Sequence, residues 1–455
     1  VVSLKNNTVS GFQYRLAIPD SFLAQYQRAN KTHQLIPLIG RVGFGIFYGV
    51  IGCFFGLAFL IKRGYLIWKK PIIAGSLLAT LVGISNLNLM PIRLHTYNPL
   101  IAQTTFLIEL GTQFVGSVVF WLILFSLALM VAESLTRKAF ENRIQLWQLL
   151  SSRVVSSPSV FGRILGGYLL GFFLIGYMIL FNHVLAPLVS GWTPSNLFAH
   201  QSMLSSYFPG VSPVVHSLSN SIWKECLFRA IPLAGAALLG KRFGFKSAWI
   251  GFALLAQAFI YAAFHGMYSG ASIPASLYLT KLIIPALLLG CVYLRFGLLP
   301  IIIAQFIYSI SVYALPLFTV IEQHTIIDQA IILLGAAAPF MYAIAMRLKQ
   351  GGFSPITEAV LNKAWEPSTK TIYRQLRPIE AFSHFKKGKL YAIGVCSLIG
   401  IAAWVMLTPF TANSPMLTLD KELVPSRVES LLKSQGIAWQ PEWKLLMSKI
   451  GRAHV

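Results

Sequence analysis

The chain has 455 residues, of which 56% are apolar and 11% are charged, and it carries a net charge of +23 at pH 7. So few charged side chains cannot cover an ordinary soluble domain, and a lipid bilayer is therefore the expected solvent. Nucleic-acid binding is excluded as the reason for the positive charge, because no basic run alternates with aromatic residues. The cysteines show no CxxC spacing and predict neither a disulfide framework nor a cysteine metal site; they are Cys53, Cys226, Cys291 and Cys396.

Apolar windows long enough to cross a bilayer recur along the chain. Such a crossing needs roughly 17 to 25 mostly apolar residues in a helix. The fifth window is interrupted by charged residues, but it is flanked and spaced like its neighbours. The sequence therefore predicts an all-α transmembrane bundle of about ten helices, at 38–61, 72–90, 111–132, 162–189, 213–240, 247–265, 276–294, 297–318, 325–346 and 390–410.

Lysine and arginine alternate between successive loops. The loops after helices 2, 4, 6 and 8 together hold only Arg93. Because such residues accumulate on the cytoplasmic side, the alternation predicts that both ends of the chain lie outside. The basic loop 350–389 is expected to be a solvated cytoplasmic loop, or else to touch anionic lipid heads. The basic residues of the other loops run from Lys62 to Lys70, from Arg137 to Arg163, from Lys241 to Lys246, at Arg295, and from Arg347 to Lys389.

The pattern also suggests how the chain is divided. We expect both ends to be cuts, because Val1 is not an initiator Met and IGRAHV at 450–455 resembles a translated sequencing adapter. No internal repeat of the kind found in many transporters is visible. The expected divisions are an extracytoplasmic tail at 1–37, helices 1 to 3 with a cytoplasmic loop at 38–160, a core at 161–320, helices 9 and 10 at 321–410, an extracytoplasmic segment at 411–449, and the artefact at 450–455.

The fifth helix contains an ionised island. Glu225 and Arg229 are spaced i, i+4, which places them on one helical face as an ion pair, while Lys224 is turned about 100° away. Ionisable groups deep in a membrane cost about 2.5 to 3.5 kcal/mol each on insertion scales and usually face a cavity or a partner. The island is therefore the candidate functional site. A buried staple that only fixes helix packing is the alternative interpretation.

Three motifs in this region carry a family resemblance. KECLFRAIPL at 224–233 resembles the EExxxR motif of the CPBP family, the intramembrane metalloproteases that include CAAX prenyl protease type 2 and bacteriocin-processing and immunity proteins. Tyr261 to His265 in the next helix is similar to the FxxxH motif of that family. The third motif, HxxxN or HxxxD, falls on Gln305 and Ser309, where both polar residues differ. AESLTR at 132–137 is also family-like, so 161–320 is expected to be a CPBP-type protease core.

The resemblance implies a catalytic centre at Glu225, Arg229 and His265, with His265 also a metal ligand. In the family, paired glutamates and histidines surround a water, often metal-activated, that attacks a peptide carbonyl inside the bilayer. Lys224, Gln305 and Ser309 replace central residues of that centre. An ammonium is a poor base and Gln is a poor metal ligand, so activity is expected to be impaired or lost. A divalent metal such as zinc is expected only in an active enzyme.

Three classes of function remain open at this point. The first is a membrane endopeptidase, impaired or inactive, that acts on membrane-associated protein substrates. The second is a catalytically silent scaffold that binds a peptide or a protein partner in the same cavity, and the third is a small-solute transporter. His265 alone also fits a satisfied interfacial histidine, and Lys224 acting as a base toward Ser309 is a minor alternative. Expected partners are lipids and membrane-associated peptides, not nucleic acid, in a bacterial inner membrane.

Overall fold

The described part of the chain covers most of the predicted helices. Of the predicted divisions, the outer segment 411–449 lies outside the described residues except for isolated positions, and 450–455 lies wholly outside them. The structure, a computed structural model, describes the two strands of a hairpin, a few isolated residues, and residues 35–94, 101–185, 204–265, 275–319, 325–364 and 387–408.

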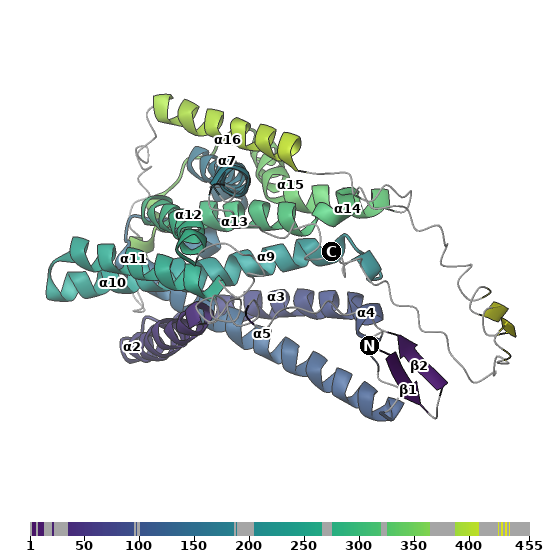
Figure 1. The fold of residues 1–455 in the computed structure, drawn as a ribbon. Helices are drawn as coiled ribbons and strands as arrows, with labels where there is room; N and C mark the ends of the chain where they lie inside the picture. The colour runs from purple at the N-terminus through teal and green to yellow at the C-terminus, as the bar shows by residue number, and fades with distance from the viewer. Residues whose placement is uncertain are drawn as a thin grey trace.

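Apart from one hairpin, the described secondary structure is helical (Figure 1). Strand β1 (Val2–Lys5) pairs antiparallel with β2 (Thr8–Phe12) within the tail that the sequence predicted without strands. The first helix runs over Leu35–Lys62 and ends in α2 (Gly56–Lys62). The other main helices are α3 (Lys69–Asn88), α4 (Met90–Leu94), α5 (Gln103–Ala139), α6 (Ser152–Val155), α7 (Pro158–Leu180), α9 (Val211–Glu225), α10 (Ile231–Phe243), α11 (Lys246–His265), α12 (Ala275–Phe296), α13 (Leu298–Tyr313), α14 (Leu315–Thr319), α15 (Thr325–Lys349) and α16 (Lys387–Leu407).

All ten predicted windows fall on helices. Windows eight and ten match shorter apolar helices, Leu298–Tyr313 and Tyr391–Leu407, and window five matches α9 together with α10. The structure thus confirms a helical bundle with seven candidate spans, while the count of ten stays a prediction. Among the described residues, the seven helices long and apolar enough to cross a membrane are Leu35–Lys62, Lys69–Asn88, Gln103–Ala139, Pro158–Leu185, Lys246–His265, Ser276–Phe296 and Ile326–Lys349.

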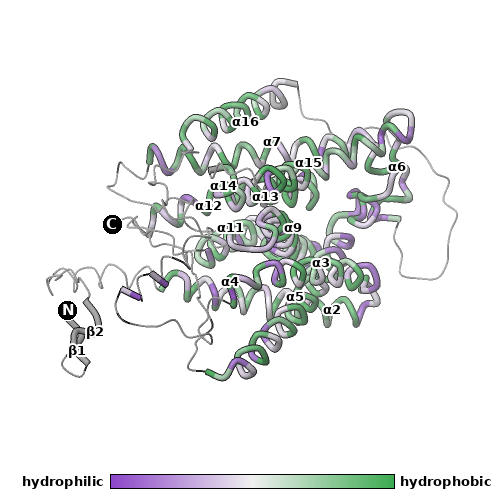
Figure 2. Tube along the Cα trace, turned by 90° about the vertical axis from the view of Figure 1, so that its right-hand side faces the viewer, coloured by the Kyte–Doolittle hydropathy of each residue, from purple (hydrophilic) through white to green (hydrophobic). Residues whose placement is uncertain are grey.

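The basic loops meet at one end of the bundle. Figure 2 shows hydrophilic residues gathered around α6, beside helices that are hydrophobic along most of their length. This common end is what the alternation of loop charges predicted. The end of α5 and the loop that follows it contact neighbouring loops and helix ends here. Lys138 Nζ lies 3.8 Å from the Tyr65 ring centroid, Glu141 Oε1 lies 2.8 Å from Lys241 Nζ in α10, and Arg143 donates to the Leu294 carbonyl in α12 and accepts from Asn362 N.

The other end of the bundle is joined by polar contacts of a different kind. Asn88, the last residue of α3, accepts from Phe208 N at 2.7 Å and donates to the Phe208 carbonyl at 2.8 Å. Gly210 N donates to Asp328 Oδ1 at 2.8 Å, which ties the start of α9 to the start of α15. These contacts involve neutral amides and one carboxylate, in contrast to the basic side chains in the contacts around α6.

Close helix packing places α13 against α7. A Cβ built on Gly167 would lie 2.8 Å from Ile303 Cβ, and one built on Gly171 would lie 2.9 Å from Ile307 Cβ. Glycines four residues apart allow helix backbones to approach in a membrane. On another face of α7, Gly176 meets α16 at an equally close approach. The helix that carries Gln305 and Ser309 is therefore held firmly in place.

Candidate functional site

The island lies on a helix with one irregular turn. Helix α9 continues through a π-helical segment, Cys226–Ala230, directly into α10. Pro232 in the first turn of α10 lacks the N–H that would bond to the Phe228 carbonyl, and its ring would clash with that carbonyl in a regular helix. A wider turn relieves this conflict, and such turns are frequent at functional sites. The local sequence thus accounts for the irregularity at the island.

Glu225 and Arg229 form the ion pair that their spacing predicts. Arg229 NH1 lies 3.2 Å from Glu225 Oε1, and both side chains are 0% exposed. Among the described residues, none of the two carboxylate oxygens or the three guanidinium nitrogens has a hydrogen-bond partner. Buried polar atoms without partners are costly, so a cluster of them points to a functional arrangement.

Aromatic rings surround the guanidinium. Arg229 Cζ lies 4.1 Å from the ring centroid of Tyr261, which provides a cation–π contact. Tyr48, from the first helix, packs edge-on against Phe228 with the ring centroids 5.0 Å apart and lies within electrostatic range of Arg229. The Tyr48 hydroxyl is buried and has no partner among the described residues. The first helix therefore contributes to the island, which sequence reasoning missed because an isolated tyrosine in an apolar helix gives no signal.

His265 ends α11 beside the same aromatic residues. Its Nδ1 lies 2.8 Å from the Tyr261 carbonyl, and its ring centroid is 4.2 Å from that of Tyr261. Because a carbonyl only accepts, Nδ1 carries the proton and Nε2 is left as an acceptor. Nε2 is buried without a partner among the described residues. His265 is thus only half satisfied, which is unlike an ordinary interfacial histidine.

Lys224 borders the island. The residue is partly buried, and its ammonium acts electrostatically on Glu225, Arg229 and His265. Its Nζ lies 5.7 Å from the ring centroid of Trp223. The structure therefore gathers Lys224, Glu225, Arg229 and His265 into one cluster. A cation stands where the family resemblance expects a carboxylate.

The third predicted motif is arranged differently. Gln305 and Ser309 are buried in α13, and Gln305 Nε2 donates to Ser309 Oγ at 3.4 Å. Within the described part of the chain, no hydrogen bond or ion pair joins either side chain to Glu225 or His265. Instead Tyr308, between them in sequence, lies within electrostatic range of Tyr261. The motif thus approaches the island through a tyrosine that sequence reasoning did not single out.

The donor set of the island does not fit a catalytic zinc ion. Such an ion needs about three protein ligands from His, Cys or carboxylate side chains. No group of three such side chains comes together among the described residues. Glu225 is engaged with Arg229, and His265 offers one nitrogen. The side chains of the island therefore do not support a metal-dependent step.

A second buried pair lies in AESLTR at the end of α5. Arg137 Nε donates to Glu133 Oε1 at 2.6 Å, and the same oxygen accepts from Leu146 N at 3.1 Å. Neighbouring residues extend this anchoring, because Thr136 Oγ1 lies 2.8 Å from the Tyr293 hydroxyl. This segment ties α5 to the following loop and to α12, so its role is structural.

Comparisons of the chain with models of known protein families, with curated proteins and with solved structures found no match. The resemblance to the CPBP family therefore rests on the motif residues of the sequence alone.

Proposed function

We propose that the chain is a CPBP-type membrane protein that binds a peptide segment of a membrane-associated protein at the island without cleaving it. The observation that carries this proposal is the cluster of buried polar atoms at Glu225, Arg229, His265 and Tyr48 that have no hydrogen-bond partner among the described residues. A peptide backbone offers both donors and acceptors, which are the groups that these atoms lack. Peptide binding therefore lowers the cost of keeping them in a membrane.

Two partly buried residues, Lys224 and His265, form the proposed entrance to this site. Lys224 and His265 retain some exposure, whereas the Glu225 and Arg229 side chains lie wholly behind them. An incoming carbonyl would meet the ammonium and an incoming N–H would meet His265 Nε2. The aromatic rings of Tyr261 and Phe228 provide the apolar walls. The arrangement supports recognition of a backbone segment within a lipid environment.

The same residues argue against hydrolysis. A peptidase needs a base to take a proton from the attacking water. Lys224 occupies the position of the first glutamate, and Glu225 is held in an ion pair. Gln305 and Ser309 are engaged with each other rather than with this cluster. The proposed setting is a bacterial inner membrane with both ends of the chain outside, where lipids and the bound peptide are the partners.

The test uses the full chain reconstituted in lipid vesicles with a fluorescent membrane peptide. We expect saturable binding by anisotropy and no cleavage on gels. Lys224→Met should weaken binding about tenfold, because one charge-assisted hydrogen bond is lost. Lys281→Met is the matched control, since that intramembrane lysine donates to Asn182 Oδ1 at 2.7 Å. Equal weakening by both substitutions, or no binding by the unmodified chain, contradicts the proposal.

A second arm examines catalysis directly. The triple substitution Lys224→Glu, Gln305→His and Ser309→Asn restores the family residues at the three replaced positions. Cleavage by this variant alone would support a binding scaffold that has lost its base. Cleavage by the unmodified chain that His265→Ala abolishes would show instead that the chain is an active peptidase.

A further inference from the structure

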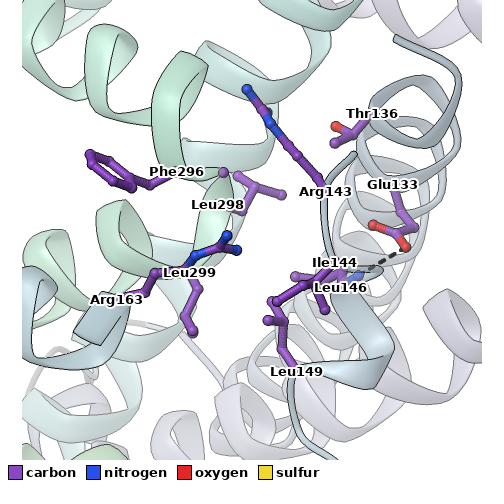
Figure 3. Close-up of a pocket in the computed structure, with 11 residues that line it drawn as sticks. Glu133, Thr136, Arg143, Ile144, Leu146, Leu149, Arg163, Phe296, Leu298 and Leu299 are labelled. Atoms are coloured by element: carbon purple, nitrogen blue, oxygen red, sulfur yellow. Dashed lines mark hydrogen bonds between the residues drawn. The ribbon is translucent and has the colours of Figure 1, made fainter. Parts of the chain in front are cut away.

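A cavity lies away from the island, at the basic end of the bundle. It is half open and has about 20 Å³ of free volume, enough for one water-sized group. Its walls come from the end of α5, the loop that follows, the start of α7 and the turn between α12 and α13 (Figure 3). Four separate segments thus meet around a space that admits one oxygen atom of a larger ligand.

Two arginines line this cavity. Arg143, from the loop after α5, and Arg163, from α7, both line it, and in Figure 3 the guanidinium end of Arg143 extends away from Arg163. The two guanidinium groups lie within electrostatic range of each other and therefore repel. Arg143 NH2 donates to the Leu294 carbonyl, whereas NH1 is buried without a partner among the described residues. An anion in the cavity would relieve the repulsion and would satisfy NH1.

The single carboxylate in the wall does not cancel this positive charge. Glu133 lines the cavity, but its Oε1 already accepts from Arg137 and from Leu146 N, the second contact drawn as a dashed line in Figure 3. Because Arg137 neutralises Glu133, the charge that remains at the cavity is that of the two arginines. The cavity therefore favours a ligand with negative charge.

The backbone adds donors on the same wall. Helix α13 begins at Leu298 after Gly297, whose φ of +88° belongs to the left-handed region, and no side chain caps the helix. Leu298 and Leu299 both line the cavity. The first N–H groups of a helix have no partner within it, and the helix dipole makes this end partly positive. Together with guanidinium groups they form the usual surroundings of a bound phosphate.

We infer that this cavity binds a phosphate group, which enters with one oxygen between Arg143, Arg163 and the start of α13. Basic pockets between transmembrane helices bind lipid head groups, and the neighbouring loops are the basic loops of the chain. The source of the phosphate is either an anionic lipid head group or free phosphate. This inference is independent of the peptide-binding proposal, because it rests on other residues.

The experiment uses the full chain purified in detergent and stripped of lipid. Thermal unfolding is followed during titration with short-chain phosphatidylglycerol, with inorganic phosphate, and with chloride at equal ionic strength. We expect a saturable rise of the unfolding temperature with phosphatidylglycerol. A rise with inorganic phosphate as well shows that the phosphate group alone suffices, whereas a rise with the lipid only assigns the site to a head group. An equal rise with chloride overturns the inference.

Substitutions locate the effect. Arg163→Gln and Arg143→Gln should each weaken the apparent affinity about tenfold, as expected for loss of one charged hydrogen bond. Arg153→Gln removes the same charge from an exposed residue near the same end and should leave the affinity unchanged. Because Arg143 also bonds to the Leu294 carbonyl, Arg163→Gln is the decisive variant if Arg143→Gln unfolds. Equal weakening by Arg153→Gln contradicts a site at this cavity.

Discussion

Two buried glutamate–arginine pairs in this chain share the same i, i+4 spacing and have opposite surroundings. In the first, Glu133 and Arg137 are 2% and 5% exposed, and Glu133 Oε1 also accepts from the backbone of the next loop. In the second, Glu225 and Arg229 are 0% exposed and touch each other, but their polar atoms have no hydrogen-bond partner among the described residues. Sequence spacing alone does not distinguish them.

The difference distinguishes a structural pair, which we call the anchor, from a pair that belongs to the candidate functional site. A buried ion pair is stabilising only when its geometry is good and further hydrogen bonds satisfy its atoms. The pair at Glu133 meets that condition and joins two segments of the chain. The pair at Glu225 does not, and it lies beside Lys224 and beside His265, whose Nε2 has no hydrogen-bond partner among the described residues. The unsatisfied pair is therefore the one that we associate with binding.

The largest expected effect is the loss of the anchor. Glu133→Gln removes the carboxylate that pairs with the buried Arg137, and we predict a loss of about 3 to 5 kcal/mol in the free energy of unfolding. Denaturant titration in detergent micelles measures it. Glu109→Gln on the same helix is the control, because Glu109 is exposed and should change stability by less than about 0.5 kcal/mol. Equal effects at the two glutamates would remove the basis for calling Glu133 an anchor.

Replacing both members of a pair by apolar residues should change the stability of the protein in different directions for the two pairs. Glu225→Leu with Arg229→Met removes two unsatisfied groups together, so we predict unchanged stability or a gain of up to about 4 kcal/mol. The matching change at Glu133 and Arg137 leaves Leu146 N without an acceptor and should cost about 1 to 3 kcal/mol. The same unfolding assay compares them. Destabilisation by both double variants would show that the island is also an anchor.

The smallest expected effect concerns an exposed pair. Glu141 and Lys241 are 63% and 40% exposed, and Lys241, which donates a hydrogen bond to Glu141, holds the pKa of that carboxyl below its usual range. A lowered folded-state pKa gives stability above the unfolded value of about 4.3 that is lost as the pH falls through the folded value.

Lys241→Gln should therefore cost less than about 1 kcal/mol at pH 7 and nothing once Glu141 is protonated. Unfolding of the variant and the unmodified chain at pH 7 and at pH 3 measures this difference. A difference that persists at low pH would mean that the contact of Lys241 does not depend on the charge of Glu141.

Part of the site followed from local spacing. The i, i+4 rule predicted the Glu225–Arg229 contact, and the atoms lie 3.2 Å apart. The ring of Tyr48 was not predicted as part of its surroundings, because it comes from a helix far away in the sequence, whereas Tyr261 belongs to the second motif. The third motif likewise predicted polar groups at the site, whereas Gln305 and Ser309 bond to each other. Whether polar groups meet depends on helix rotation, which no local pattern contains.

The sequence by itself determined the helical windows and the common end of the basic loops. Both depend on local properties, because the length of an apolar segment decides whether it can cross a bilayer and the charge of a loop decides on which side it lies. Only the tertiary structure decided which glutamate–arginine pair is satisfied. The Leu146 amide that completes the Glu133 pair is placed by the fold of a loop, and the rings around Arg229 are placed by two other helices. Satisfaction of a buried charge depends on partners from distant segments, and packing alone brings them together.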